Sequence, residues 1–256
     1  MELENIRIKP VWPKSKEMIW FEKFEHLDEQ SHQKRVAIRI PVWSYAASLL
    51  IPVLLVCHFY TVTEKTARGE HAVVQLPGHS TVTLNAESKL SYKPFIWMIS
   101  RKVRLEGEAC FEVKNGNRFS VQSGRNQVNV LGTTFNVYAR QELYRVTCLS
   151  GQVEVRSGQE TVVLKPNMQA VLREPKFALL NDVTPSMAAG WIQGEFVFAG
   201  TPLQEVIAEV ERQYNINVAM DYERNHFYTG NFSKSDDPEE ILAIIGKAFG
   251  ITFRIK

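Results

Sequence analysis

The stretch that decides the fold of this chain is VRLEGEACFEVKNGNRFSVQSGRNQVNVLGTTFNV, residues 103–137. Apolar and polar residues alternate in it, as in FSV at 119–121 and FNV at 135–137. An alternation with a period of two is typical of strands that bury one face. Turn sequences such as NG at 115–116 and SG at 123–124 separate the alternating segments. The stretch therefore predicts short strands joined by tight turns.

The same pattern extends outward on both sides of this stretch. Alternating apolar segments recur at 82–84, 144–146, 153–155 and 163–164. Strands at such spacing favour an all-β fold of the solenoid, sandwich or barrel type. We assign residues 64–187 to this domain.

Past Pro185 the pattern changes to strands that alternate with helices. Two segments each predict a strand, a helix and a strand, over residues 195–199, 202–214 and 216–220, then 227–232, 238–249 and 251–255. Both helices open with a proline in the first turn, where proline is tolerated, after Thr201 and Asp237 as expected N-caps. Residues 188–256 are therefore expected to form a small α+β domain of two β-α-β halves.

Residues 40–63 contain no charged side chain. At about 1.5 Å of rise per residue they would give roughly 36 Å of helix, more than the roughly 30 Å of bilayer hydrocarbon. Aromatic residues lie near both ends of the segment, Trp43 and Tyr45 at one and Phe59 and Tyr60 at the other. Such rings favour the two membrane interfaces. The segment predicts a single transmembrane helix.

Basic residues flank this segment unequally. Those before it are Lys23, Lys34, Arg35 and Arg39, and those just after it are Lys65 and Arg68. Because basic residues concentrate on the cytoplasmic side of a span, the short segment 1–39 is expected in the cytoplasm and the rest outside the membrane. A cleaved signal peptide is the competing interpretation, but its charged region would be far too long here.

The segment before the membrane predicts one amphipathic helix. Ser15 is a suitable N-cap, and Trp20, Phe24 and Leu27 follow at spacings of i, i+4 and i+7. This apolar face is either a docking surface for a cytoplasmic partner or the face of a helix that lies on the bilayer. We favour the partner, because Lys and Arg do not dominate the polar face as they do in membrane-surface helices.

Composition argues against several classes of function. The net charge is +2, and no basic run interleaves with aromatic residues, so direct binding of nucleic acid is not expected. The three cysteines, Cys57, Cys110 and Cys148, form no C-x-x-C pair and have no histidine at metal-ligand spacing. We therefore expect no metal site and no disulfide framework. Cys148 lies in an alternating strand pattern and is expected to be a small buried hydrophobe.

No catalytic constellation can be assembled from the sequence. Glu106, Glu108 and Glu112 lie at alternating strand positions and could suggest paired carboxylates for sugar hydrolysis. A solvated strand face explains the same pattern, and we favour it. Phosphate-binding glycine motifs are absent from the sequence. We expect a protein that is not an enzyme and binds no cofactor.

Several ordered motifs together give the chain a resemblance to a known family. They are LP at 76–77, STVTLNAESKLSY at 80–92, LEGEACFEV at 105–113, VLGTTFNV at 130–137, GQVEV at 151–155, LKPNMQA at 164–170, PLQEV at 202–206 and TGNF at 229–232. Over residues 68–255 the chain resembles FecR-family anti-sigma factors of the kind common in Bacteroidetes-type bacteria. Asn167 stands where the family usually has glycine, and asparagine also tolerates the left-handed conformation.

The resemblance implies a single-pass regulator in the bacterial inner membrane, with the N-terminus cytoplasmic and the C-terminus periplasmic. Such a regulator binds an extracytoplasmic-function sigma factor inside the cell, here through Trp20, Phe21, Phe24 and Leu27. Its periplasmic part contacts the signalling domain of a TonB-dependent outer-membrane transporter. The C-terminal domain is similar to the secretin and TonB short N-terminal domain, in keeping with partner binding by strand addition.

Some family members break the chain at a Gly-Thr bond, and Gly132-Thr133 has the residues that such an acyl shift would need. A tight turn that requires glycine explains the same pair, and we favour the turn.

Together the sequence predicts a mixed architecture. It comprises a cytoplasmic segment 1–39, a transmembrane helix 40–63, an all-β, solenoid- or sandwich-like periplasmic domain 64–187 and an α+β domain 188–256. Two other functions stay open. The first is a membrane-anchored periplasmic β domain that binds or cleaves glycans. It predicts exposed aromatic residues beside paired carboxylates, and Trp97 in the loop 94–100, which could equally bind lipid or protein, is the only hint of it. The second is a scaffold for secretion, suggested by the C-terminal domain alone.

Overall fold

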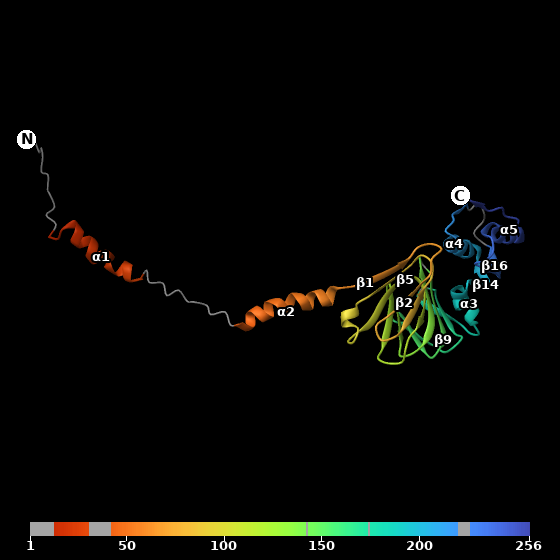
Figure 1. Ribbon diagram of the computed structural model, residues 1–256, viewed down its shortest axis with the longest axis horizontal. Coiled ribbons are helices and arrows are strands. Elements are labelled where there is room, and N and C mark those ends of the chain that lie inside the picture. The colour runs from red at the N-terminus through yellow and green to blue at the C-terminus, as the bar shows by residue number, and fades with distance from the viewer. Residues whose placement is uncertain (1–12, 31–41, 142, 174, 220–225) are drawn as a thin grey trace, which may run out of the picture. The chain divides into compact units, whose positions relative to one another are not determined.

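The computed structural model describes residues 13–30, 42–141, 143–173, 175–219 and 226–256 (Figure 1). The chain falls into two compact units, one that ends at Ile51 and one that runs from Pro52 to Lys256. Each unit is described by itself.

The first described helix, α1 (Lys16–Gln30), begins where the sequence predicts. The backbone N–H of Met18 donates to the hydroxyl of Ser15 at 3.3 Å. This bond satisfies one of the N–H groups that the first turn of a helix leaves without a partner, so the predicted N-cap is confirmed.

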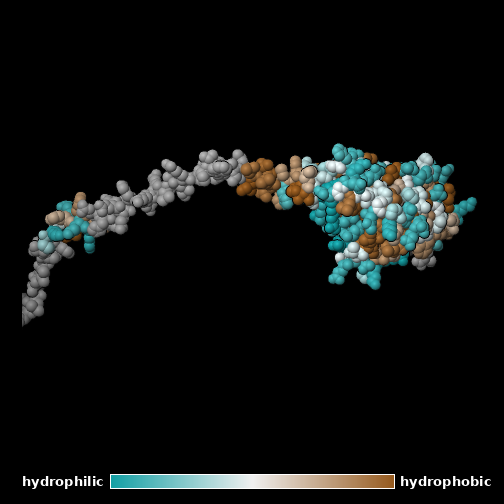
Figure 2. Space-filling view, turned by 90° about the horizontal axis from the view of Figure 1, so that it is seen from below, coloured by the Kyte–Doolittle hydropathy of each residue, from teal (hydrophilic) through white to brown (hydrophobic). Residues whose placement is uncertain are grey.

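The second helix, α2 (Val42–Phe59), contains Pro52. Hydrophobic residues dominate its described part, which Figure 2 shows in brown, whereas the β domain is mostly teal and white with brown patches. Among the described residues, no helix has both the length and the apolar character that crossing a membrane requires. The transmembrane helix expected at 40–63 is therefore not confirmed, and residues 40 and 41 lie outside those described.

The predicted β domain is confirmed. Its strands are β1 (Val62–Thr66), β2 (Ala72–Gln75), β3 (Thr81–Leu84), β4 (Ser88–Tyr92), β5 (Arg101–Glu112), β6 (Phe119–Ser123), β7 (Asn126–Val130), β8 (Thr134–Arg140), β9 (Leu143–Ser150), β10 (Val153–Ser157), β11 (Glu160–Leu164), β12 (Gln169–Arg173) and β13 (Lys176–Leu180). They form one sheet system in the order β11-β10-β7-β6-β5-β8-β9-β12-β13. Strands β3 and β4 also pair with β5, and β2 and β1 pair in turn with β3 and β4. Figure 1 shows the strands folded round on themselves.

The long strand β5 joins the two parts of this sheet system. Its first half pairs with β4 and β6, and its second half pairs with β3 and β8. Gly107 lies at the change, with φ of 103°. A Cβ atom there would lie 2.7 Å from the Cα of Ser88, so only glycine fits without a shift of the backbone.

The core of the β domain is built from the alternating apolar positions. Phe111, Phe119 and Phe135 are fully buried, and the rings of Phe111 and Phe135 stack at 5.0 Å. Cys148 is also fully buried in this core, as the sequence predicts.

Trp97 is not an exposed aromatic residue. It follows the short helix η1 (Pro94–Ile96), is only 4% exposed, and packs edge-on against Tyr92 and Phe119. The exposed ring that a glycan-binding site would need is not present here, because the loop inserts the indole into the core. The single hint of a glycan-binding surface is therefore lost.

The C-terminal domain follows the predicted order of strands and helices. It consists of α3 (Pro185–Ala189), η2 (Gly190–Gln193), β14 (Glu195–Pro202), α4 (Leu203–Tyr214), β15 (Val218–Ala219), β16 (Phe227–Ser233), α5 (Pro238–Phe249) and β17 (Arg254–Ile255). The strands β14 and β16 pair antiparallel, as do β15 and β17.

Only one of the two predicted N-caps in this domain is correct. The carboxylate of Asp237 accepts from the N–H of Glu239 at 2.8 Å and caps α5. Thr201 does not cap α4, because β14 continues through Pro202, which pairs with Phe227. The strand predicted at 216–220 is shorter, and residue 220 lies outside those described.

Candidate functional site

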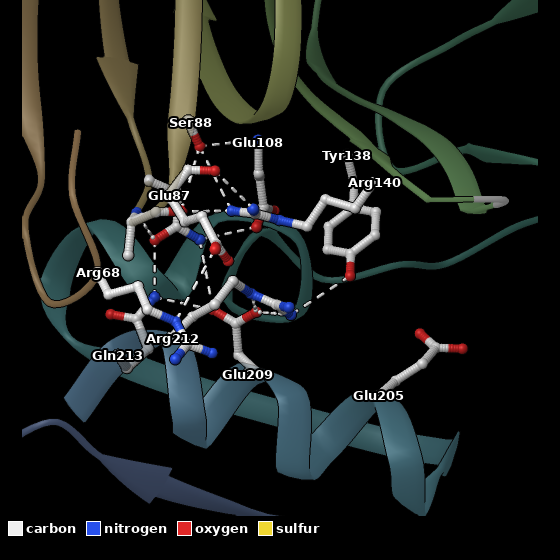
Figure 3. Close-up of polar contacts among 12 residues, drawn as sticks. Arg68, Glu87, Ser88, Glu108, Tyr138, Arg140, Glu205, Glu209, Arg212 and Gln213 are labelled. Atoms are coloured by element: carbon white, nitrogen blue, oxygen red, sulfur yellow. Dashed lines mark hydrogen bonds and ion pairs between the residues drawn. The ribbon is translucent and has the colours of Figure 1, made fainter. Parts of the chain in front are cut away.

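Helix α4 buries two faces of different character. The apolar face, with Leu203, Val206, Ile207 and Val210, packs in the core of the C-terminal domain. The other face presents polar side chains to the β domain (Figure 3), and its buried members are Glu209, Arg212 and Gln213. Burial of polar groups is costly unless each finds a partner, so this contact depends on complementary groups in the β domain.

The β domain supplies those groups from three neighbouring segments. They are Asn85 after β3, Glu108 in β5 and Asn136 in β8, all buried. The amide of Asn85 donates to Glu108 Oε2 at 2.7 Å, and the amide of Asn136 donates to Oε1 at 2.8 Å. Both oxygens of the Glu108 carboxyl group therefore accept hydrogen bonds inside the β domain.

Glu108 corrects the prediction of a solvated strand face. Glu106 and Glu112 are exposed as expected, but Glu108 is only 6% exposed. Glu108 is buried because helix α4 covers this part of β5, and the side chain of Glu209 on α4 approaches Glu108 (Figure 3). Three glutamates with the same local pattern thus have two different environments, and paired carboxylates for sugar hydrolysis are not formed from them.

A hydrogen bond from Gln213 to Asn85 connects the two domains, and further bonds hold the side chains of α4 in place. The Gln213 amide donates to Asn85 Oδ1 at 2.7 Å and to Glu209 Oε1 at 2.8 Å. Arg212 donates to Glu209 Oε2 through both Nη2, at 2.7 Å, and Nε, at 3.1 Å. We call Asn85, Glu108, Asn136, Glu209, Arg212 and Gln213 the interdomain polar cluster.

The two carboxyl groups of the interdomain polar cluster differ in their pKa. Burial, with the nearby charge of Glu209, raises the pKa of Glu108 above its usual value. Burial would also raise the pKa of Glu209, but the guanidinium groups of Arg212 and Arg140 outweigh it and lower that pKa. Ionisation is therefore disfavoured at Glu108 and favoured at Glu209.

One oxygen in this arrangement has no partner. The Asn136 amide donates to Glu108, but Asn136 Oδ1 is buried and has no hydrogen-bond partner among the described residues. A buried acceptor without a partner is costly, so the interdomain polar cluster is not fully satisfied.

Further contacts surround the cluster. Arg140 donates to the carbonyl oxygens of Ala86 and Glu87, at 2.5 and 2.8 Å. Arg145 pairs with Glu205 of α4 at 3.0 Å. Other bonds that link the two domains run from Arg68 to Asn217 at 2.9 Å and from Lys234 to the carbonyl of Gly69 at 2.8 Å. Because charged groups take part in many of these bonds, the joint has a defined register.

A groove lies beside this joint. Its volume is about 470 Å³, and it is lined by the whole of β14 together with residues of β8, β9, β12 and α4. Of the described strands, β14 pairs with β16 alone. The second edge of β14 therefore offers backbone groups of the kind that an added strand would bind.

The predicted cytoplasmic contact is exposed where the structure describes it. On α1 the Trp20 side chain is 64% exposed, Phe21 is also exposed, and the rings of Trp20 and Phe24 stack at 4.0 Å. Leu27 belongs to α1, but its side chain lies outside those described. Three of the four predicted residues are thus exposed on α1, and two of them, Trp20 and Phe24, stack on each other.

Gly132 and Thr133 lie in the link between β7 and β8. A Cβ atom on Gly132 would overlap Asn115 Oδ1, and the hydroxyl of Thr133 donates to the carbonyl of Gln152 at 3.0 Å. The close approach of Asn115 accounts for the glycine. Cleavage of this bond stays a prediction.

Most of the interdomain polar cluster could not be predicted from local sequence patterns. Glu209, Arg212 and Gln213 are typical of an exposed helix face, and Asn136 lies in an ordinary strand pattern. Among the described residues, no group of three or more His, Cys, Asp or Glu side chains is arranged to hold a metal ion. The arrangement suits a protein–protein contact and a rigid joint.

The comparisons with known proteins agree with this architecture. Residues 62–154 match the family described as FecR protein, and residues 195–256 match the family described as FecR, C-terminal. The first match begins with β1 and the second with β14. None of the curated proteins with which the sequence was compared is similar to it.

Two crystal structures of proteins assigned as anti-sigma factors, both from Parabacteroides distasonis ATCC 8503, are similar to the chain. The first has 31% identity and a TM-score of 0.71, and the match covers 77% of this chain and 95% of the other. The second has 30% identity and a TM-score of 0.69, with coverage of 76% and 95%. The agreement in sequence and fold over both domains shows that the chain belongs to the FecR family of anti-sigma factors.

Proposed function

We propose that this protein is a single-pass inner-membrane regulator that relays a signal from a TonB-dependent outer-membrane transporter to an extracytoplasmic-function sigma factor. The observation that carries the proposal is the family membership over both the β domain and the C-terminal domain. The regulator acts by binding and not by catalysis.

The cytoplasmic end of the relay is α1. Its exposed aromatic residues, Trp20, Phe21 and Phe24, suit an amphipathic helix that docks in an apolar groove of a partner. Exposed aromatic anchors of this kind often supply most of the binding energy of an interface. The proposed partner is the sigma factor.

The connection between the two compartments is the segment 40–63, which we take as the membrane span. The support for it lies in the sequence, namely the absence of charged residues and the aromatic residues at both ends. The excess of basic residues before the segment supports a cytoplasmic N-terminus.

The periplasmic end of the relay is the C-terminal domain. The free edge of β14 and its groove suit a strand supplied by the signalling domain of the transporter. Helix α4 is bonded to the β domain by the buried amide pair of Gln213 and Asn85 and by the ion pair of Glu205 and Arg145, so a force on β14 would pass to the β domain.

The experiment that tests the proposal is affinity purification of the full-length protein from its native membranes, with mass spectrometry of the proteins that accompany it. We expect a sigma factor and an outer-membrane transporter. The double variant Trp20→Ala/Phe24→Ala should lose the sigma factor and keep the transporter.

A matched control is Met18→Ala, which changes another exposed apolar residue of α1 but leaves the aromatic stack intact. It should retain both partners. Recovery of the sigma factor with the double variant would refute α1 as the contact, and the absence of any sigma factor from the unaltered protein would refute the proposed output.

A further inference from the structure

The loop after β4 exposes a group of large apolar side chains. Phe95, Met98 and Ile99 are 60%, 90% and 90% exposed. Trp97, between them, is buried in the core and fixes the loop from below. The three exposed side chains thus form a patch on a loop that the buried Trp97 holds in place. Contiguous exposed apolar groups of this kind mark interaction sites, whereas single exposed apolar residues do not.

This loop lies against the C-terminal end of α2. The rings of Tyr60 and Phe95 are 5.3 Å apart. The ammonium of Lys93 donates to the carbonyl of His58 at 2.9 Å and lies 5.7 Å from the ring centre of Phe59. In Figure 1, η1 lies beside the junction of α2 and β1. All of these residues belong to the unit that begins at Pro52.

We propose that Phe95, Met98 and Ile99 insert into the periplasmic surface of the same lipid bilayer that residues 40–63 cross, so that the β domain is seated on the membrane. This inference rests on the proposed function, since it takes that segment as the span. If the segment crosses the bilayer, its end at Phe59 lies at the bilayer surface, and a loop in contact with that end lies there too.

The chemistry of the loop suits a lipid surface. Apolar side chains of monotopic proteins enter the boundary between headgroups and acyl chains to a depth of about 5–10 Å, within reach of a loop tip. Lys93 before the loop and the exposed Lys102 after it would attract anionic headgroups. Aromatic residues such as Tyr60 and Phe95 favour the same zone. A lipid occupant is therefore favoured over a protein, which would have to fit between the loop and the bilayer.

The test uses the full-length protein in vesicles of phosphatidylethanolamine and phosphatidylglycerol that contain a nitroxide-labelled lipid. An environment-sensitive fluorophore is attached at Met98→Cys, with Cys57→Ser to remove the more accessible of the natural thiols. The matched control carries the fluorophore at Gln159→Cys. Gln159 is exposed in the turn after β10. Ser157 beside this turn pairs with Asn126 at the start of β7, whereas Phe119 pairs with Val130 at the opposite end of β7.

We expect the nitroxide lipid to quench the fluorophore at position 98 at least about threefold more than the fluorophore at position 159, as for an interfacial residue. In a second variant, Met98→Asp/Ile99→Asp with the label at Phe95→Cys, quenching should fall to the level of position 159 while circular dichroism stays unchanged.

Flotation of the same samples separates this inference from the proposed function. A chain that does not float with the vesicles would refute the span and the seating together. A chain that floats but shows equal quenching at positions 98 and 159 would keep the span and overturn the seating. Strong quenching at position 95 in the double aspartate variant would also overturn the role of Met98 and Ile99.

Discussion

Removal of the charge of Glu209 should be far more costly than removal of the neighbouring carboxyl group of Glu108. Glu209 is the only carboxylate that Arg212 bonds among the described residues, and both side chains are buried. In Glu209→Gln the guanidinium of Arg212 would keep its charge in the protein interior, with the Tyr138 hydroxyl at 3.5 Å as its other partner.

The expected magnitude follows from this geometry. At an effective dielectric constant of about 20, opposite charges about 4 Å apart attract by about 4 kcal/mol. Removal of one partner of a buried ion pair typically costs about 3–5 kcal/mol. Burial disfavours the ionised form of Glu108, so Glu108→Gln, which places a neutral group of similar shape there, should cost less than about 1 kcal/mol near neutral pH.

The assay is urea unfolding of residues 52–256, which form one compact unit, followed by tryptophan fluorescence. Trp97 reports on the β domain and Trp191 on the C-terminal domain, because each is buried in its own core. Glu112→Gln, an exposed change on the same strand as Glu108, is the control and should lie within about 0.5 kcal/mol of the unaltered protein.

Two results would refute the reasoning. The first is a cost of less than about 1 kcal/mol for Glu209→Gln, which would mean that solvent or another group satisfies Arg212. The second is an equal cost for Glu108→Gln and Glu209→Gln, which would mean that both carboxyl groups are ionised in the folded protein.

Three further predictions concern the same unit. Since folding raises the pKa of Glu108, this residue contributes to the free energy of unfolding at low pH, and the contribution is lost as pH rises through the raised pKa. Urea unfolding at increasing pH should therefore show the Glu108→Gln variant becoming progressively more stable relative to the unaltered protein, and a constant difference in stability would contradict this. Gly107→Ala should lower the free energy of unfolding by about 2–3 kcal/mol, because a Cβ atom meets the backbone of Ser88 and φ is 103°; denaturant titration measures the loss, and an unchanged midpoint would show that the backbone yields. Trp97→Ala should cost about 3–5 kcal/mol, as expected for a buried aromatic residue, and thermal unfolding that matches the unaltered protein would disprove its place in the core.

The sequence predicts most of the elements because their signals are local. Alternation locates the strands of the β domain, and Asp237 before a proline and two glutamates marks the start of α5. The left-handed backbone of Asn167, with φ of 66°, also follows from the residue type. Each of these features is set by neighbours within a few positions along the chain.

The predictions that fail, or that the sequence does not suggest, depend on partners far away along the chain. Glu108 has the same alternating neighbours as Glu106 and Glu112, and it is buried because Glu209, about a hundred positions later, lies on a helix that covers it. Trp97 is buried by strands that precede and follow its loop. Local periodicity carries no information on such contacts, so the joint between the domains cannot be found by periodicity alone.

This joint has the properties that the proposed relay requires. An apolar contact of similar size would tolerate sliding, since the hydrophobic effect has no direction. Here the amide of Gln213 cannot move from Asn85 without leaving a buried donor unsatisfied. Apolar side chains of the β domain, among them Cys110, also pack in the core of the C-terminal domain. A force applied at β14 therefore meets a joint that resists both sliding and separation, and the two domains should move as one body.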